Sequence, residues 1–246
     1  MLLFLPGLIC DARTFAAQTA AFADSRAVTG YGFADSLPAM ARVVLAQADR
    51  DGHDEFDLFG HSMGGRVALE VYRLAPHRVR RLALSSTGVD SLGESEPAKR
   101  HALQAIGHEQ GYEALVDAWL PPMVADDNRA NDALYGPMRQ MCLDKGQAMF
   151  DAQINALLMR PEQASLLDEI TCPTLIMTGR LDTWSPPAQH EAIAARIADS
   201  TLVIVEGAGH MLPLEAPDAV NEAIAAWLQR PANQTTTRQP ALGEAH

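Results

Sequence analysis

A serine flanked by glycines is the strongest chemical signal in this 246-residue sequence. The run Gly60-His61-Ser62-Met63-Gly64 follows a short apolar stretch at 56–59 and precedes a helical pattern. A strand that turns this sharply into a helix strains its central residue, and the flanking glycines avoid collisions there. The pattern predicts that Ser62 projects as a nucleophile at a helix N-terminus, whose positive end favours developing negative charge. The simpler alternative is a tight turn with an ordinary capping serine.

A serine hydroxyl needs a base within hydrogen-bond reach and an acid that orients the base. Asp182 follows the apolar run 174–178, and His210 follows the run 201–205. Functional residues of parallel sheets gather at the carboxyl ends of the strands, so we expect Asp182 and His210 to meet Ser62. The order Ser, Asp, His along the chain differs from the orders in chymotrypsin and subtilisin. The three residues predict nucleophilic attack on a carbonyl, with His210 as the base.

Each partner of the serine has competitors. Asp182 could cap its own turn, and Asp90, in the loop after the run 79–85, is a second candidate acid. His61 adjoins the serine, but neighbours in a strand point to opposite sides, so we expect it to pack beneath the turn. Most of the other histidines fall in helices, at helix ends, in an inserted segment or in the tail: His53, His77, His101, His108, His190 and His246.

A tetrahedral intermediate also needs preorganised donors for its oxyanion, and backbone N–H groups are sufficient. We assign this role to Met63, which follows the serine, and to Leu8, in the turn after the apolar run 2–5. Neither a metal nor an organic cofactor is expected. Cys10, Asp11 and Arg13 follow this turn and could also face the substrate. The simpler interpretations are a buried apolar thiol for Cys10, a helix cap for Asp11 and a solvated surface group for Arg13.

The elements that must position these residues are short apolar runs that alternate with helical patterns. The runs predict buried parallel strands at 2–5, 26–29, 56–59, 79–85, 174–178 and 201–205. The helical patterns between most of them lie near 14–22, 38–48, 64–74, 187–197 and 217–228. We therefore expect an α/β fold with a mostly parallel sheet of about six strands, flanked by helices.

The alternation stops after the strand at 79–85. Residues 91–168 have helical periodicity without a good strand, which predicts a helical cap inserted into a core of residues 1–90 and 169–230. Residues 231–246 lack apolar periodicity and are expected to form a disordered tail. The methionines of the segment 91–168 could line the substrate pocket, because their flexible thioether side chains adapt to a ligand. The alternative for each of them is a place in the hydrophobic core of the cap. The substrate pocket is assigned to Met123, Met138, Met141 and Trp184.

Composition restricts the partners of the protein. The formal net charge of −12 repels phosphate backbones and anionic lipids, so we expect neither a nucleic acid nor a membrane partner. Three separated cysteines favour neither a disulfide framework nor a zinc site, and they fit a reducing compartment. The apolar start lacks the features of a secretory leader, and no run is long enough to span a bilayer. We expect a cytoplasmic monomer or homodimer.

The motifs together resemble the α/β-hydrolase fold superfamily. The resemblance covers nearly all of residues 2–231 and rests on the serine motif at 60–64, on Gly179-Arg180-Leu181-Asp182 and on Gly207-Ala208-Gly209-His210. Pro6-Gly7 stands where the superfamily usually has His-Gly, which keeps a backbone donor in place. The first two strands of the superfamily pattern are expected to be missing.

The resemblance implies hydrolysis of a small carboxylic ester or lactone, with that small molecule as the partner. Among similar families, simple carboxylesterases and enol-lactone hydrolases of aromatic catabolism fit the short length and the Ser62-Met63-Gly64-Gly65 sequence. A carbon–carbon bond hydrolase or a perhydrolase would use the same triad. A signal receptor on the same fold and a cofactor-free lyase or synthase are the alternatives from other classes.

Overall fold

Within residues 1–232, which the computed structural model describes, six strands form one sheet in the order β2-β1-β3-β4-β5-β6. All five neighbouring pairs are parallel. The strands are β1 (Leu2–Leu5), β2 (Ser25–Ala27), β3 (Phe56–His61), β4 (Val79–Ser85), β5 (Thr174–Gly179) and β6 (Ser200–Val205). The predicted parallel sheet of about six strands, flanked by helices, is confirmed.

The central strand β1 is buried on both faces, which explains why its four residues are all apolar. Successive side chains point to opposite faces, so Leu3 and Leu5 join one hydrophobic cluster and Phe4 joins the other. On the second face the rings of Phe4 and Phe15 stack with centroids 4.9 Å apart, and Phe59 packs against both. The central strands are thereby fixed on both sides, and their carboxyl ends lie at one edge.

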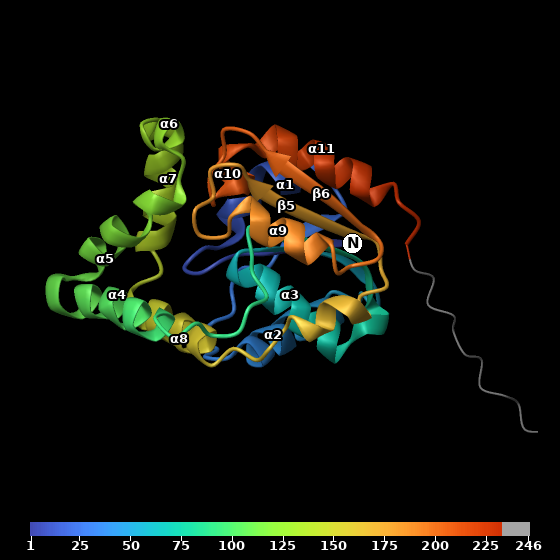
Figure 1. The fold of residues 1–246 in the computed structure, drawn as a ribbon, viewed down its shortest axis with the longest axis horizontal. Coiled ribbons are helices and arrows are strands. Elements are labelled where there is room, and N and C mark those ends of the chain that lie inside the picture. The colour runs from blue at the N-terminus through green and yellow to red at the C-terminus, as the bar shows by residue number, and fades with distance from the viewer. Residues whose placement is uncertain (233–246) are drawn as a thin grey trace, which may run out of the picture.

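The helices form a layer on each face of the sheet (Figure 1). Helices α2 (Leu37–Arg50), α3 (Met63–Leu74) and α9 (Pro187–Ala194) pack into the first cluster. Helices α10 (Leu212–Glu215) and α11 (Pro217–Leu228) pack into the second, beside α1 (Ala16–Ala21). The helix predicted at 14–22 begins instead as a 3-10 turn, η1 (Ala12–Phe15), because the Asp11 carboxylate accepts from the Arg13 N–H at 3.0 Å.

The chain between β4 and β5 contains only helices and loops. The helices are α4 (Glu96–Gln110), α5 (Tyr112–Trp119), α6 (Asp126–Arg129), α7 (Asp132–Leu143) and α8 (Gln147–Leu158), with short 3-10 turns η3 (Pro121–Met123) and η4 (Ser165–Glu169). Another short turn, η2 (Pro76–Arg78), precedes β4. Helices α4 to α7 extend away from the sheet in Figure 1. We call residues 91–168 the cap, and its status as a separate domain remains a prediction.

Most of the predicted tail at 231–246 lies outside the described residues, which end at 232. A search of the described residues finds no helix with the length and hydrophobicity that a membrane span requires.

Candidate active site

Ser62 occupies the turn between β3 and α3 in a strained conformation. Its φ of 56° lies in the left-handed region that non-glycine residues rarely adopt. The Ser62 N–H donates to the carbonyl of Ser85 at 2.9 Å, and the Ser62 carbonyl accepts from the Thr87 hydroxyl at 2.7 Å and from the Gly65 N–H at 2.9 Å. These three bonds hold the turn against a strain of about 1–3 kcal/mol. The Ser62 side chain is thereby presented to a cavity at the edge of the sheet.

Two glycines make the turn possible. A Cβ atom on Gly60 would lie 2.4 Å from the carbonyl oxygen of Gly64, and one on Gly64 would lie 2.1 Å from the carbonyl oxygen of Leu5. Both distances are far below van der Waals contact, so a larger residue would push α3 away from the sheet. The glycines of the serine motif therefore serve close backbone approach.

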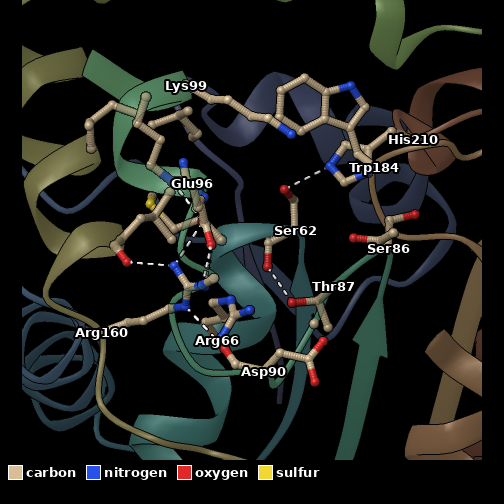
Figure 2. A pocket seen from close by; sticks show the side chains of 18 of the residues that line it. Ser62, Arg66, Ser86, Thr87, Asp90, Glu96, Lys99, Arg160, Trp184 and His210 are labelled. Carbon is tan, nitrogen blue, oxygen red and sulfur yellow. Dashed lines mark hydrogen bonds and ion pairs between the residues drawn. The ribbon is translucent and has the colours of Figure 1, made fainter. Parts of the chain in front are cut away.

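The loops after β5 and β6 bring an acid and a base to Ser62. The Nε2 atom of His210 lies 2.8 Å from the Ser62 Oγ, and the Nδ1 atom lies 2.9 Å from Oδ2 of Asp182. Figure 2 shows the Ser62 hydroxyl directed at the His210 ring. When Nδ1 carries the proton and donates it to Asp182, Nε2 is free to accept from the serine hydroxyl. The structure thus brings together the three residues that sequence selects.

Asp182 is buried and fully engaged. Its Oδ1 atom accepts from the backbone N–H groups of Trp184 at 2.9 Å and Ser185 at 2.8 Å. Burial alone raises the pKa of the Asp182 carboxyl, but the charge of His210, the hydrogen bond to His210 and the two backbone donors together lower this pKa below 3.8. The carboxylate therefore stays ionised beside the imidazole.

Glu215, on α10, holds both sides of His210. Its Oε2 atom accepts from the Gly209 N–H at 3.0 Å, and Oε1 accepts from the Met211 N–H at 2.9 Å. The same carboxylate accepts from the Ala125 N–H and the Asn128 side chain of the cap, each at 2.9 Å. One side chain thus fixes the loop of the candidate base and ties it to the cap.

The two backbone donors assigned to the oxyanion flank Ser62. The turn after β1 passes so close that a Cβ on Gly7 would lie 3.1 Å from the Ser62 Cβ. Neither the Leu8 nor the Met63 N–H has an acceptor among the described residues, so both are available. The next residue, Ile9, has a φ of 47° and donates its N–H to Oε1 of the buried Gln153 at 2.7 Å. A cap side chain therefore holds the turn that carries the Leu8 donor.

The competing acid and base do not join this arrangement. Both ring nitrogens of the buried His61 lack a hydrogen-bond partner among residues 1–232. Burial, followed by the charge of His210, lowers the pKa of His61 to about 3. The Asp90 carboxylate contacts Gln189 at 3.4 Å and lines the cavity. Within residues 1–232 no three His, Cys, Asp or Glu side chains gather into a set that could hold a metal ion.

The residues after the oxyanion turn have structural partners. Cys10 is buried, and Asp11 caps η1 and forms an ion pair with Lys145. Arg13 pairs with Asp144 at 2.6 Å. The contacts of Cys10, Asp11 and Arg13 match the simpler interpretations, and none of the three lines the cavity.

A cavity of about 440 Å³ extends from Ser62 between the sheet edge and the cap. Met123 and Trp184 line it, as sequence predicts, and Trp184 remains 43% exposed beside the opening. Met138 and Met141 do not line it: both are buried in the first hydrophobic cluster, and the Met141 sulfur accepts from the Thr14 hydroxyl at 3.5 Å. Their assignment to the substrate pocket is therefore corrected to core packing, the alternative that sequence also left open.

Sequence reasoning missed two features of the site. Arg66 lines the cavity and lies in the first turn of α3, four residues after Ser62, which precedes the helix at its N-cap position. This spacing is a signal that sequence offered. No pattern in the sequence indicates the role of Glu215, because its four hydrogen bonds depend on how the His210 loop packs against the cap.

The parallel sheet, the serine at the strand-to-helix turn and the Ser62, His210 and Asp182 contacts define an α/β-hydrolase fold with a serine-histidine-aspartate site. A family model described as "Alpha/beta hydrolase family" matches residues 2–223. The chain therefore belongs to the alpha/beta hydrolase family, which confirms the resemblance.

Known proteins of several activities are similar to this chain. A 2-hydroxy-6-oxononadienedioate/2-hydroxy-6-oxononatrienedioate hydrolase of Klebsiella pneumoniae is 28% identical over 197 residues, which span 77% of this chain and 68% of that protein. A thermophilic esterase of Thermogutta terrifontis superposes with a TM-score of 0.85 and 26% identity, over 92% of this chain and 88% of the esterase. An enol-lactonase of Burkholderia xenovorans shares the fold with a TM-score of 0.83 and 21% identity, over 93% and 91% of the two chains.

Proposed function

We propose that the protein hydrolyses a small carboxylic ester or lactone through an acyl-enzyme formed on Ser62. The observation that carries the proposal is the continuous chain of hydrogen bonds from the Ser62 hydroxyl through His210 to Asp182, at 2.8 and 2.9 Å. Both distances lie within the reach required for proton transfer between a nucleophile and its base. The two unused backbone donors beside Ser62 supply the remaining requirement.

In the first half of the reaction, His210 takes the proton of Ser62 as the Oγ atom attacks the carbonyl carbon. The carbonyl oxygen gains negative charge and is held by the backbone N–H groups of Leu8 and Met63. Asp182 orients the imidazole and stabilises its protonated form. The tetrahedral intermediate then collapses as the bond to the leaving oxygen breaks and His210 protonates that oxygen, which leaves an acyl group on Ser62.

Water completes the cycle. His210 takes a proton from a water molecule that attacks the acyl carbonyl, the same two N–H groups hold the second oxyanion, and the proton returns to the Ser62 oxygen as the acid leaves. The cap restricts access of bulk water to this chemistry.

One observation favours a second candidate. The relative with 28% identity has a named substrate with a 6-oxo group and no ester. Hydrolysis of a carbon–carbon bond next to a ketone would use the same three residues. A perhydrolase, a receptor and a cofactor-free lyase or synthase stay as alternatives without a specific observation in their favour.

A substrate panel with matched variants tests the proposal. Wild-type protein, Ser62→Ala and Ser91→Ala are assayed with 4-nitrophenyl esters, aliphatic lactones and a vinylogous diketone. Ser91 is exposed at the same cavity, so its variant controls for loss of a hydroxyl. We expect ester or lactone turnover that Ser62→Ala abolishes and Ser91→Ala retains. Turnover of the diketone alone would favour the second candidate, and Ser62-independent turnover would refute both.

The expectations about partners and location are proposals of the same kind. We propose a small-molecule substrate without nucleic acid or membrane partners, a monomeric or homodimeric state and a cytoplasmic location. The three cysteines are buried as free thiols, which fits a reducing compartment.

A further inference from the structure

One end of the cavity beside Ser62 is strongly cationic, although the protein as a whole has a net charge of −12. Four basic side chains line the cavity: Arg66, Lys99, Arg100 and Arg160. Two acidic side chains line it as well: Glu96 and Asp90. These six Arg, Lys, Asp and Glu side chains together carry an excess of two positive charges. This excess is opposite in sign to the rest of the molecule.

Glu96 is already neutralised by two of the four cations. Its Oε1 atom accepts from Arg100 Nη2 at 2.6 Å, and its Oε2 atom accepts from Arg160 Nη2 at 2.6 Å. These contacts outweigh the effect of burial and lower the pKa of Glu96 to about 2. Arg160 also donates to the carbonyls of Leu157 and Ser91, so its guanidinium is saturated. Both carboxylate oxygens of Glu96 are therefore already engaged by arginines, and Glu96 does not neutralise a third one.

Arg66 is the third arginine, and it has no ionic partner among residues 1–232. Its Nη1 atom makes two long contacts, 3.3 Å to the carbonyl of Asp90 and 3.4 Å to Oε1 of Gln163. No bond from its Nε or Nη2 to a described residue is found. Figure 2 shows its guanidinium on the cavity wall below Glu96. The Arg66 side chain is partly buried, and a guanidinium in such a place that uses one of its three nitrogens has donors left for a ligand.

The environment of Arg66 disfavours its charge unless an anion joins it. Burial, and then the neighbouring charge of Arg160, lower the pKa of Arg66 to about 10. At neutral pH the group is still protonated. An anion in the cavity would relieve both effects, since it would pair with the guanidinium and offset the repulsion by Arg160.

Lys99 adds a second unpaired cation at the same cavity. It is exposed on α4, forms no ion pair with any described residue, and extends along the cavity in Figure 2. A flexible ammonium group at the opening suits attraction of an anionic ligand, while Arg66 offers the planar fork that binds a carboxylate through two parallel hydrogen bonds.

We propose that Arg66 binds a carboxylate of the substrate, at a distance from the carbonyl that Ser62 attacks, so that the preferred substrates are half-esters or lactones bearing a free carboxylate. The inference rests on the proposed function for its ester or lactone bond, and it adds the substrate class. Lys99 assists by attracting the anion toward the cavity. The apolar walls at Trp119, Ile154 and Leu157 enclose the carbon chain between the two ends.

A pair of esters of similar length provides the test. The carboxylate ester is mono-4-nitrophenyl glutarate, and the neutral ester is 4-nitrophenyl pentanoate. The measured quantity is the ratio of kcat/KM for the carboxylate ester to that for the neutral ester. We expect this ratio to fall by about 10- to 100-fold in Arg66→Gln, the loss expected when a hydrogen-bonded charge pair is removed. Arg66→Lys, which keeps the charge without the fork, should lie between Arg66→Gln and the wild type.

A control arginine separates this effect from general loss of charge. Arg139→Gln removes an arginine that pairs with Glu113 and Asp117 on α5 of the cap and does not line the cavity. It should keep the wild-type ratio. An Arg66→Gln ratio equal to the wild-type ratio, in protein that unfolds at the wild-type temperature, would overturn the inference.

A binding measurement keeps the inference testable if neither ester is hydrolysed. Isothermal titration of glutarate into wild-type protein, Arg66→Gln and Arg139→Gln should show binding that only Arg66→Gln weakens. If the wild type hydrolyses neither ester but binds glutarate in a way that depends on Arg66, the proposed function would be refuted and the carboxylate site would be supported. Equal binding of glutarate by all three proteins, or equal affinity for inorganic phosphate and glutarate in the wild type, would refute the carboxylate site.

Discussion

Removal of the Glu215 carboxylate tests whether the His210 loop is held as the structure indicates. Glu215 accepts four hydrogen bonds at 2.9 to 3.0 Å, two from N–H groups on either side of His210 and two from the cap. Hydrogen bonds to a charged group are each worth about 1.5–3 kcal/mol, but Glu215 is only half-buried, so water replaces part of them. We expect Glu215→Ala to lower the free energy of unfolding by about 2–4 kcal/mol.

The same substitution should slow the reaction, because His210 would lose its alignment with Ser62. We expect kcat for 4-nitrophenyl ester hydrolysis to fall by about 10- to 100-fold, since misplacement by about 1 Å costs a factor of that size. KM should change far less. Denaturant unfolding and steady-state kinetics on the same preparation measure the two effects.

Glu206→Ala is the matched control. Glu206 follows β6 in the loop that leads to His210, but it is 74% exposed, and among the residues that the structure describes its one ion pair is with Arg180. This variant should match the wild type in stability and kcat. If Glu215→Ala lost stability while kcat stayed at the wild-type value, the claim that Glu215 positions His210 would be refuted, and a purely structural role would remain.

Three further predictions follow from single positions. Asp182→Asn should lower kcat by about 10⁴-fold through loss of the orienting carboxylate. Because the pKa of Asp182 is lowered in the folded protein, the ionised carboxylate contributes its full stabilisation above pH 3.8, and this contribution is lost as the pH falls through the lowered pKa. The free energies of unfolding of wild type and variant, measured in urea, should therefore converge in acid. His61→Leu should make the free energy of unfolding less sensitive to acid. The His61 pKa of about 3 lies below the ordinary 6.5, so the unfolded chain takes up a proton first and the wild type loses up to about 2 kcal/mol of stability between pH 6.5 and 5. An equal loss in the variant would contradict this. Gly64→Ala should destabilise the fold by more than about 3 kcal/mol in thermal unfolding, because its Cβ would meet the Leu5 carbonyl oxygen at 2.1 Å. Gly136→Ala, on α7, meets no other residue in space and should change stability by no more than about 1 kcal/mol, since the propensity gained by Ala is offset by the restriction that Pro137 imposes on the residue before it.

The sheet could be predicted because its strands are buried on both faces. The run 2–5 is apolar without alternation, and a glycine-flanked serine directly after the run 56–59 has few structural solutions. The ends of elements were less predictable. The strand expected at 26–29 is found at Ser25–Ala27, and the helix expected at 14–22 starts with a 3-10 turn, because local capping by Asp11 decides where the turn begins.

The triad could be selected from sequence because parallel strands collect their carboxyl ends at one edge. The cavity could not, because its walls depend on how the cap lies against the sheet. Periodicity shows that Met138 and Met141 are buried but not which side of their helix faces the substrate. The unpaired state of Arg66 depends on Glu96 being engaged by two other arginines, a three-dimensional fact that spacing does not contain.

The central claim is that Ser62 is a nucleophile activated by His210. Its most direct test is labelling with an alkyl fluorophosphonate, from whose phosphorus the Ser62 oxygen would displace fluoride, followed by mass spectrometry of proteolytic peptides. We predict a phosphonyl group on Ser62 in the wild type, and labelling slowed by at least about 10³-fold when His210 is replaced by Ala. A Ser62 that stays unlabelled in folded protein, or that is labelled at the same rate without His210, would contradict the account.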